Sequence, residues 1–214
     1  MGSVLKVENL RKSYGGKEVL RGVNLVLKRG ETVCILGRNG AGKTTLLNSI
    51  LGTTSCEGRI EVKVNKVGFL SQNPALYPRL TVWENLSLFS ALMGVEMGSE
   101  ISELVELLGM SGEVNKRVMD MSHGNAKKAE LLCALVGDPE LLIPDEPLVS
   151  LDYDSRNAVL KLLSRMKESG KTMLIVTHLP EVMCPLCDRT YELVDGRLRE
   201  TTCENTLKEN KNGG

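Results

Sequence analysis

The stretch 33–44 reads VCILGRNGAGKT, and it says more about the fold than any other part of the chain. An apolar, β-prone run comes first, and GRNGAGKT matches the pattern G-x-x-x-x-G-K-[ST]. The helix-prone TLLNSIL at 45–51 follows, with Gly52 to end it. A strand, a glycine loop and a helix in this order let backbone N–H groups and the positive helix end surround phosphates. We therefore predict a phosphate-binding loop in which Lys43 neutralises the β- and γ-phosphates and the Thr44 hydroxyl holds Mg²⁺.

The segment LLIPDEP at 141–147 places two carboxylates after an apolar run. A phosphate-binding loop needs a carboxylate to hold the metal, and we assign this to Asp145, acting through water. Glu146 beside it is placed to orient and activate a water molecule. An Asp–Glu pair after a strand is as often a helix cap, but its position after the phosphate loop favours the chemical role.

Pro144 complicates this assignment, because proline has no N–H and does not belong inside a central strand. Two interpretations stay open. Pro144 marks the end of the strand, or it shifts Asp145 and slows hydrolysis.

Composition narrows the class of protein. The chain has 214 residues, enough for one domain with a good core. Lys+Arg and Asp+Glu are each 27, so there is no basic excess and nucleic acid is not an expected partner. No apolar run approaches the ~18 residues of a membrane span, and the N-terminus lacks the apolar core of a signal peptide. We expect a soluble cytoplasmic chain that reaches a membrane only through a partner.

The six cysteines do not suggest a disulfide framework in a cytosolic chain of this length. Cys184 and Cys187 form a C-x-x-C, but no second pair accompanies them, and a zinc site needs about four ligands. We expect the cysteines to serve packing.

The order of patterns along the chain predicts the architecture. The first third is rich in β-prone runs, the part from Thr81 to about Val136 has helical spacing, and strand and helix patterns alternate after it. Ser99 is a candidate cap for a helix with an apolar stripe over 101–108, and 154–168 is a second predicted helix. We predict an α/β fold of the P-loop NTPase type. Its mixed β-sheet core comprises residues 1–72 and 138–214, and residues 73–137 form an inserted helical subdomain. The terminal KENKNGG is polar, and we expect it to fray.

Seven elements in sequence suggest a family. They are Tyr14, the phosphate loop at 37–45, Gln72, MSHGN at 121–125, PDEP at 144–147, Ser150-Leu151-Asp152 and Thr177-His178. In this order they resemble the nucleotide-binding subunits of ATP-binding cassette transporters, from about residue 4 to residue 200. Alone, each has an ordinary structural explanation as a turn, cap or surface residue.

The resemblance implies a role for each element, with ATP and Mg²⁺ as ligands. Tyr14 would stack on adenine, Gln72 would link the metal to the helical subdomain, and His178 would reach the γ-phosphate. Asp152 would lie at the junction between two subunits. The implied catalytic residues are Lys43, Glu146 and His178, and the implied metal ligands are Thr44, Gln72 and Asp145. The other implied nucleotide contacts come from Gly37, Asn39, Gly40, Gly42 and Thr45.

The MSHGN stretch resembles the family's LSGGQ motif, which closes over the γ-phosphate held by the partner's loop. Ser122 and Gly124 keep the hydroxyl and the open backbone. His123 replaces the first glycine and Asn125 the glutamine. The histidine is tolerable if the position needs no positive φ and the side chain points away from the phosphate. We interpret MSHGN as a variant motif that resembles those of short, exporter-type cassettes; an impaired motif is the alternative.

The resemblance implies a homodimer or heterodimer of ATPase subunits, head to tail, with two ATP molecules between them. ATP binding joins the subunits, and hydrolysis lets them part. An integral-membrane transporter subunit would rest near Gln72, Tyr77 and Trp83 and hold the chain on the inner face of the cell membrane. Two alternatives remain: a soluble cassette ATPase such as one for iron-sulfur cluster assembly, or a nucleotide-binding module that does not hydrolyse.

Overall fold

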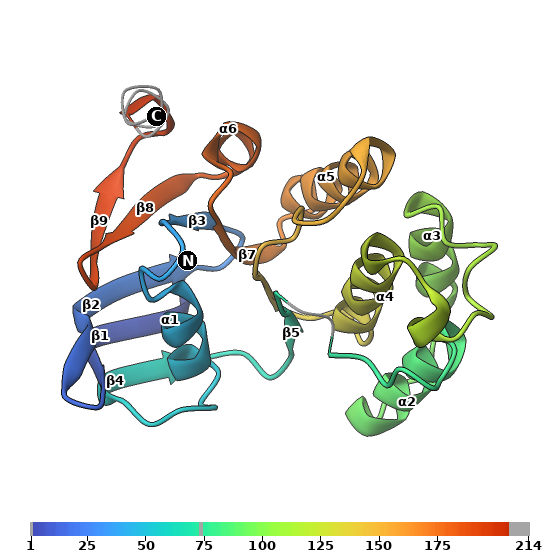
Figure 1. The fold of residues 1–214 in the computed structure, drawn as a ribbon, viewed down its shortest axis with the longest axis horizontal. Helices are drawn as coiled ribbons and strands as arrows, with labels where there is room; N and C mark the ends of the chain where they lie inside the picture. The colour runs from blue at the N-terminus through green and yellow to red at the C-terminus, as the bar shows by residue number, and fades with distance from the viewer. Residues whose placement is uncertain (1, 73–74, 206–214) are drawn as a thin grey trace. The chain divides into compact units, whose positions relative to one another are not determined.

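The computed structural model describes residues 2–72 and 75–205 and divides the chain into two compact units (Figure 1). The terminal unit contains the residues up to 65 and those from 170 onward. The middle unit contains residues 66–169. The predicted limits of the helical subdomain, 73–137, stay a prediction, and the polar KENKNGG lies outside the described residues.

The terminal unit begins with an antiparallel sheet. β1 (Ser3–Tyr14) pairs with β2 (Lys17–Lys28) on one side and with β4 (Glu57–Val62) on the other. Buried and exposed residues alternate along the second half of β2, where Val23, Leu25 and Leu27 are buried. This alternation is typical of a sheet with only one face on the core.

The same unit contains a mixed sheet in which β3 (Thr32–Leu36) is central. It runs parallel to β7 (Thr172–Thr177) and to β8 (Arg189–Val194), while β9 (Arg197–Thr201) pairs antiparallel with β8. Every residue of β3 and β7 is buried, which explains their continuous apolar runs. The helices of this unit are α1 (Lys43–Ile50), α6 (Pro180–Met183) and the short 3₁₀ turn η2 (Cys184–Leu186).

The middle unit combines two parallel strands with helices. β5 (Val67–Leu70) pairs with β6 (Leu141–Pro144). A Cβ at Gly68 would collide with the carbonyl oxygen of Ala134, so α4 packs directly on β5. The helices are α2 (Val82–Met93), α3 (Ser99–Leu107), α4 (His123–Leu135), α5 (Tyr153–Glu168) and the 3₁₀ turn η1 (Val118–Asp120).

The first residues of the helices can be compared with the predicted helix and cap. The predicted helix 154–168 is observed as α5, beginning one residue earlier. The prediction that Ser99 caps α3 is wrong, because the N-cap is Gly98 and Ser99 is already helical. The side-chain cap in this region is Thr81, which forms a reciprocal capping box with Glu84 at the start of α2.

The structure also bears on the expectations for the cysteines and for membrane-spanning segments. Cys34, Cys133 and Cys184 are buried, as expected of packing cysteines, whereas Cys56 is exposed. Among the described helices, none combines the length and the apolar content that crossing a membrane requires.

Candidate functional site

The glycine loop between β3 and α1 has the backbone that its sequence predicts. Gly40 has φ 82 and Gly42 has φ 103, values that residues with a Cβ rarely adopt. Gly37 is required for another reason, since a Cβ there would lie 3.1 Å from the carbonyl oxygen of Leu193. The three glycines therefore shape a tight loop that ends at the N-terminus of α1.

Lys43 is the first residue of α1, and its side chain reaches back to the start of this loop. Its side chain is 7% exposed, and Nζ donates to the carbonyl oxygens of Gly37 at 2.6 Å and Arg38 at 3.3 Å. No acidic residue lies in the first turn of α1, so the positive end of the helix is not neutralised there. Thr44 is exposed and Thr45 is half-buried in this turn. A buried cation, the N–H groups at a helix start and two hydroxyls together suit a phosphate.

The two other predicted site residues of the terminal unit lie at strand ends. Leu36 and Thr177 are paired in register at the carboxyl ends of the parallel strands β3 and β7. His178 and the glycine loop consequently leave the sheet at the same edge, which is where ligands bind in parallel sheets. Tyr14 ends β1, is 49% exposed, and has the Lys12 ammonium 4.8 Å from its ring centroid.

In the middle unit, the residues predicted to bind the metal and to activate water also lie at one edge of a sheet, where β5 and β6 end. Leu70 and Pro144 pair at the ends of β5 and β6, and the Asp145 N–H donates to the Leu70 carbonyl at 2.8 Å. Gln72 and Asp145 therefore follow neighbouring strand ends. Pro144 is the last residue of β6, so it ends the strand, as the first of its two interpretations has it.

Asp145 and Glu146 are almost completely buried, at 2% and 3% exposure. Glu146 has φ 51, a left-handed conformation that costs a residue with a Cβ about 1–3 kcal/mol. The surrounding structure therefore holds the Glu146 carboxylate against local backbone preference.

The MSHGN stretch forms the start of α4. The Ser122 hydroxyl caps the helix by accepting from the Asn125 N–H at 3.1 Å. Ser122 and His123 are exposed. His123 is not among the residues with positive φ, so the replacement of glycine is accommodated without backbone strain. A Cβ at Gly124 would lie 3.3 Å from the Ser150 carbonyl oxygen, which leaves little room for a side chain there.

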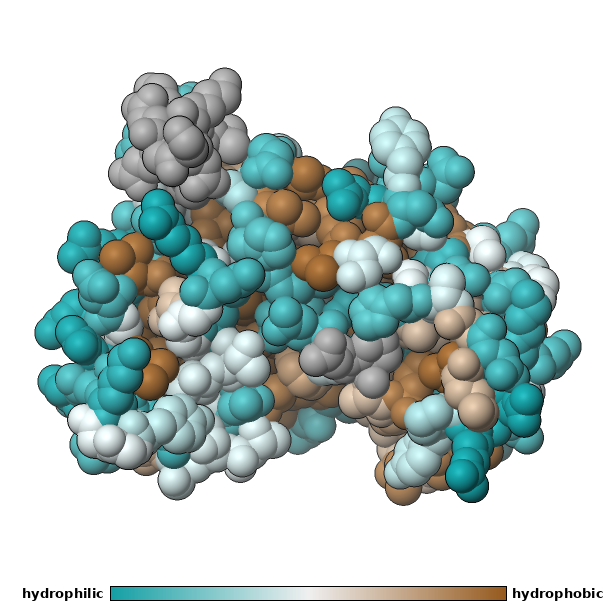
Figure 2. Space-filling model, viewed as in Figure 1, coloured by the Kyte–Doolittle hydropathy of each residue, from teal (hydrophilic) through white to brown (hydrophobic). Residues whose placement is uncertain are grey.

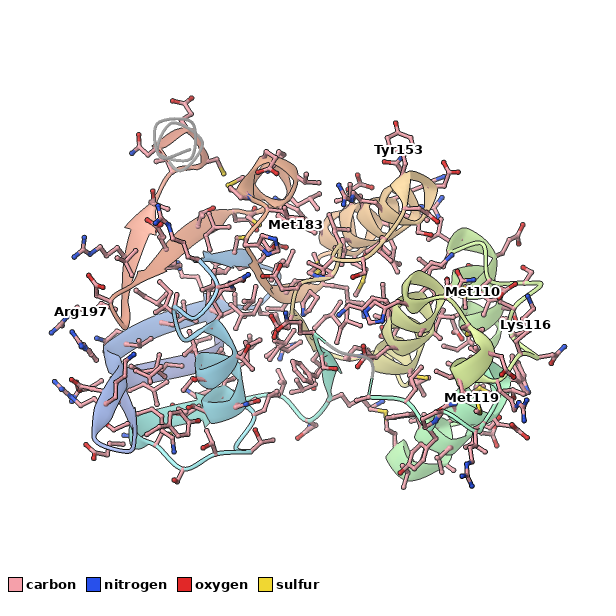
Figure 3. All side chains as sticks on the ribbon, viewed as in Figure 1. Met110, Lys116, Met119, Tyr153, Met183 and Arg197 are labelled. Atoms are coloured by element: carbon pink, nitrogen blue, oxygen red, sulfur yellow. The ribbon has the colours of Figure 1, made fainter. Side chains whose placement is uncertain are left out.

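Asp152 caps the next helix of the middle unit. Its carboxylate accepts from the Ser155 N–H at 2.7 Å, and this hydrogen bond lowers the pKa of Asp152. Tyr153 follows at 78% exposure and points away from α5 into solvent (Figure 3). Asp152 is thus an ordinary helix cap in a single chain, and a role at a subunit junction stays a prediction.

Sequence reasoning missed two charged residues that contact this region. Lys127 and Glu130 lie on α4 and are 2% and 4% exposed. Three charged residues, at 127, 128 and 130, stand close to the apolar run LLCALV in the same helix-prone stretch, and this was the available signal. Charged residues are rarely buried unless they are paired.

A family model described as ABC transporter matches residues 20–149. The match begins in β2, ahead of the glycine loop, and ends beyond Asp145 and Glu146. The chain belongs to the ABC transporter family. The resemblance of the seven elements is thereby confirmed at the level of the family.

The chain aligns over most of its length with ATP-binding proteins of ABC transporters. Linearmycin resistance ATP-binding protein LnrL of Bacillus subtilis is 34% identical over 210 residues, which are 91% of this chain and 68% of LnrL. Nod factor export ATP-binding protein I of Rhizobium leguminosarum is 35% identical over 208 residues, which are 90% of this chain and 67% of that protein.

Solved structures of ABC cassettes share the fold. An ATP-binding subunit of an ABC transporter superposes with a TM-score of 0.85 at 27% identity, covering 99% of this chain and 95% of that one. A dimeric cassette in a post-hydrolysis state with ADP and Pi gives 0.83 at 28% identity, covering 93% and 98%. The predicted P-loop NTPase fold is confirmed. The chain is an ATP-binding and ATP-hydrolysing subunit of an ABC transporter.

Proposed function

We propose that this ABC subunit binds ATP with Mg²⁺ and hydrolyses it only when a second cassette closes the site. Thr44, Gln72 and Asp145 would hold the metal through a hydroxyl, an amide and a carboxylate. This all-oxygen set fits Mg²⁺, which prefers oxygen ligands and keeps several waters. Bound Mg²⁺ would neutralise charge on the phosphates.

The other side chains would divide the remaining tasks. Lys43 neutralises the β- and γ-phosphates, while Gly37, Asn39, Gly40, Gly42 and Thr45 surround them with backbone and hydroxyl donors. The exposed ring of Tyr14 presents a face on which adenine stacks. Glu146 and His178 hold the attacking water, and the buried Glu146 carboxylate takes its proton. This division is typical of phosphoryl transfer, where catalysis is mostly positioning and charge stabilisation.

The observation that supports a second cassette is the exposed, capped start of α4. Ser122 and Gly124 present a hydroxyl and open backbone at a positive helix end. We assign them to the γ-phosphate of a partner's ATP, with Asp152 near the junction, in a homodimer or heterodimer. The similar post-hydrolysis cassette is dimeric, which supports this arrangement.

Two substitutions of Ser122 test the arrangement. Asp and Asn cap helices as well as Ser does, so Ser122→Asp and Ser122→Asn should both keep α4 folded. Only the aspartate places a negative charge against the partner's γ-phosphate, and like charges in contact cost several kcal/mol. In a Glu146→Gln background we expect Ser122→Asp to weaken ATP-dependent dimerisation by about 100-fold or more, and Ser122→Asn to leave it near normal.

Analytical ultracentrifugation with and without ATP measures the effect, and ATP affinity of the monomer is the control. Equal dimerisation of the two variants would contradict a role for Ser122 at the partner's phosphate.

We further propose that an integral-membrane transporter subunit docks on an apolar patch of the middle unit, defined by Tyr77, Trp83 and Met119. These side chains are 53%, 43% and 57% exposed. Backbone hydrogen bonds join the segments that carry them, from Met119 N to Pro78 O at 2.9 Å and from Trp83 N to Val114 O at 2.9 Å. Met119 lies at the surface beside α2, over which hydrophobic residues gather (Figures 2 and 3).

Such a partner would hold the chain on the inner face of the cell membrane. A similar structure, cbiO1 of Clostridium perfringens, is part of the transporter complex cbiONQ. The Nod factor protein has export in its name, and the MSHGN form resembles exporter-type cassettes. We infer an exporter.

The patch is tested by Trp83→Glu, with Leu92→Glu as the matched control on the same helix. Leu92 is 69% exposed at the other end of α2. We expect Trp83→Glu to abolish co-purification with the integral-membrane partner subunit and to leave ATP turnover of the isolated chain unchanged. Leu92→Glu should change neither. Full co-purification of Trp83→Glu would exclude the patch as the docking site.

A further inference from the structure

The strongest unexplained feature of the middle unit is the pair of buried charges on α4. Lys127 and Glu130 are three residues apart, so they lie on the same side of the helix. At 2% and 4% exposure they are among the most buried ionisable residues described. Burial of an ion is costly unless its hydrogen bonds are satisfied, so their partners indicate what keeps them in place.

Lys127 joins the two segments that carry the proposed metal ligands. Its Nζ donates to the carbonyl oxygens of Ser71, of Gln72 at 3.1 Å and of Asp145 at 3.3 Å. An ammonium has three protons, and all three are used here on backbone. Lys127 thereby ties the segment after β5 to the end of β6.

Glu130 accepts hydrogen bonds from N–H and hydroxyl donors near Gln72, whereas Lys127 donates to carbonyl oxygens there. Its Oε1 accepts from the Ser71 hydroxyl at 2.6 Å, from the Ala75 N–H at 3.0 Å and from the Ser71 N–H at 3.4 Å. Among the described residues, the other oxygen, Oε2, is buried without a hydrogen-bond partner. The Glu130 carboxylate therefore holds Ser71, the residue directly before Gln72, and also Ala75.

The local charges favour this arrangement. Burial lowers the pKa of Lys127, whereas the nearby carboxylates of Glu130, Asp145 and Glu146 raise it. The ammonium is thus surrounded by acidic groups on α4 and after β6, which offset part of its desolvation cost. An apolar residue at 127 would remove the donor that these three backbone carbonyls share.

We propose that Lys127 and Glu130 are positioning residues that hold the Gln72 segment against the Asp145 strand end, so that both side chains meet Mg²⁺ in register. The inference rests on the proposed metal roles of Gln72 and Asp145. It goes beyond them because it gives α4, at whose start MSHGN lies, a second role. Two side chains of α4 hold the backbone on which the proposed metal ligands Gln72 and Asp145 lie. Neither residue touches ATP or the metal itself.

The first experiment separates metal binding from nucleotide binding. Lys127→Met keeps the length and apolar stem of the side chain but removes the three donors. We expect the Mg²⁺ concentration for half-maximal ATP turnover to rise about 10-fold or more, because removing groups that orient metal ligands typically weakens metal affinity by about 10–100-fold. ATP affinity measured in EDTA should stay unchanged, and Lys127→Arg should recover part of the Mg²⁺ response.

The matched control is Lys128→Met. Lys128 is the next residue of α4 and is 6% exposed, but its charge acts on Glu113 and Asp152, and it donates to neither strand end. We expect a normal Mg²⁺ requirement for this variant. An equal rise in Lys127→Met and Lys128→Met would overturn the proposal, since the effect would then be one of charge or of helix stability.

A milder variant, Ser71→Ala, keeps the proposal testable if Lys127→Met does not fold. Ser71→Ala removes only the hydroxyl that bonds Glu130, on a half-buried residue. We expect a rise in the Mg²⁺ requirement of about 3-fold, smaller than the rise of about 10-fold expected when an orienting side chain is lost entirely. The Ser71 and Ala75 N–H groups still donate to Glu130 in this variant. Turnover of Ser71→Ala with an unchanged Mg²⁺ response would count against the proposal.

A double-mutant cycle with Gln72→Ala separates this inference from the metal roles on which it rests. If Lys127 acts through Gln72, adding Lys127→Met to Gln72→Ala should raise the Mg²⁺ requirement little further, whereas independent effects multiply. Additive effects overturn the inference alone. If Gln72→Ala and Asp145→Asn both keep the normal Mg²⁺ response, the proposed metal site itself fails, and the inference with it.

Discussion

Glu146→Gln should lower ATP turnover by about 100-fold or more, because general-base catalysis typically contributes about 100- to 10,000-fold. Glutamine has nearly the same shape as glutamate, so it fits the 3% exposed site and can keep the same strained backbone at φ 51. Its amide cannot take a proton from water at neutral pH. The variant should therefore bind ATP as well as the native chain and fail only at the chemical step.

The same variant should form a lasting dimer with ATP. If ATP joins two subunits and its cleavage lets them part, blocked cleavage leaves the joined form populated. Size-exclusion chromatography with ATP, with ADP and without nucleotide gives the measurement, alongside phosphate release.

Glu168→Gln is the control, since Glu168 is an exposed residue at the end of α5 and its substitution should change neither property. Native turnover in the Glu146→Gln protein would remove Glu146 from its proposed role.

Lys43→Ala should have the second large effect, a loss of ATP binding rather than of hydrolysis alone. The Lys43 ammonium is 7% exposed and is held by carbonyl oxygens of its own loop. In that position Lys43 places a buried positive charge where the loop would hold the phosphates of ATP. Removing one partner of a buried, hydrogen-bonded charge pair costs about 2–5 kcal/mol, so we expect ATP affinity to fall about 30-fold or more.

Isothermal titration with ATP measures the loss, and Lys28→Ala is the control, because Lys28 is an exposed lysine at the end of β2 in the same unit. The titration also distinguishes the two variants, since Glu146→Gln should keep the native ATP affinity and Lys43→Ala should bind ATP much more weakly. Native affinity in Lys43→Ala would show that the phosphates bind elsewhere.

Much of the fold and of the candidate site could be predicted because the informative residues are neighbours in the sequence. The φ values of Gly40 and Gly42 and the start of α1 at Lys43 depend on a run of eight residues. The capping of α4 by Ser122 and of α5 by Asp152 is equally local. Ser99 shows the limit of such reasoning, because either of two adjacent residues can begin a helix and the tertiary context selects one.

By itself, then, the sequence determined the family and the phosphate loop, and it supplied the candidates for the reactive side chains, whose roles stay predictions. The structure showed that Pro144 is the last residue of β6, where the sequence had left two interpretations open. Only the tertiary structure decided which backbone Lys127 and Glu130 hold, because Ser71 and Asp145 lie 56 and 18 residues from Lys127 along the chain. Local pattern distinguishes buried from exposed positions, but it does not say which distant carbonyls will surround a buried charge. That choice is made when α4 packs on β5 and the desolvated ammonium must find acceptors where the two strands end.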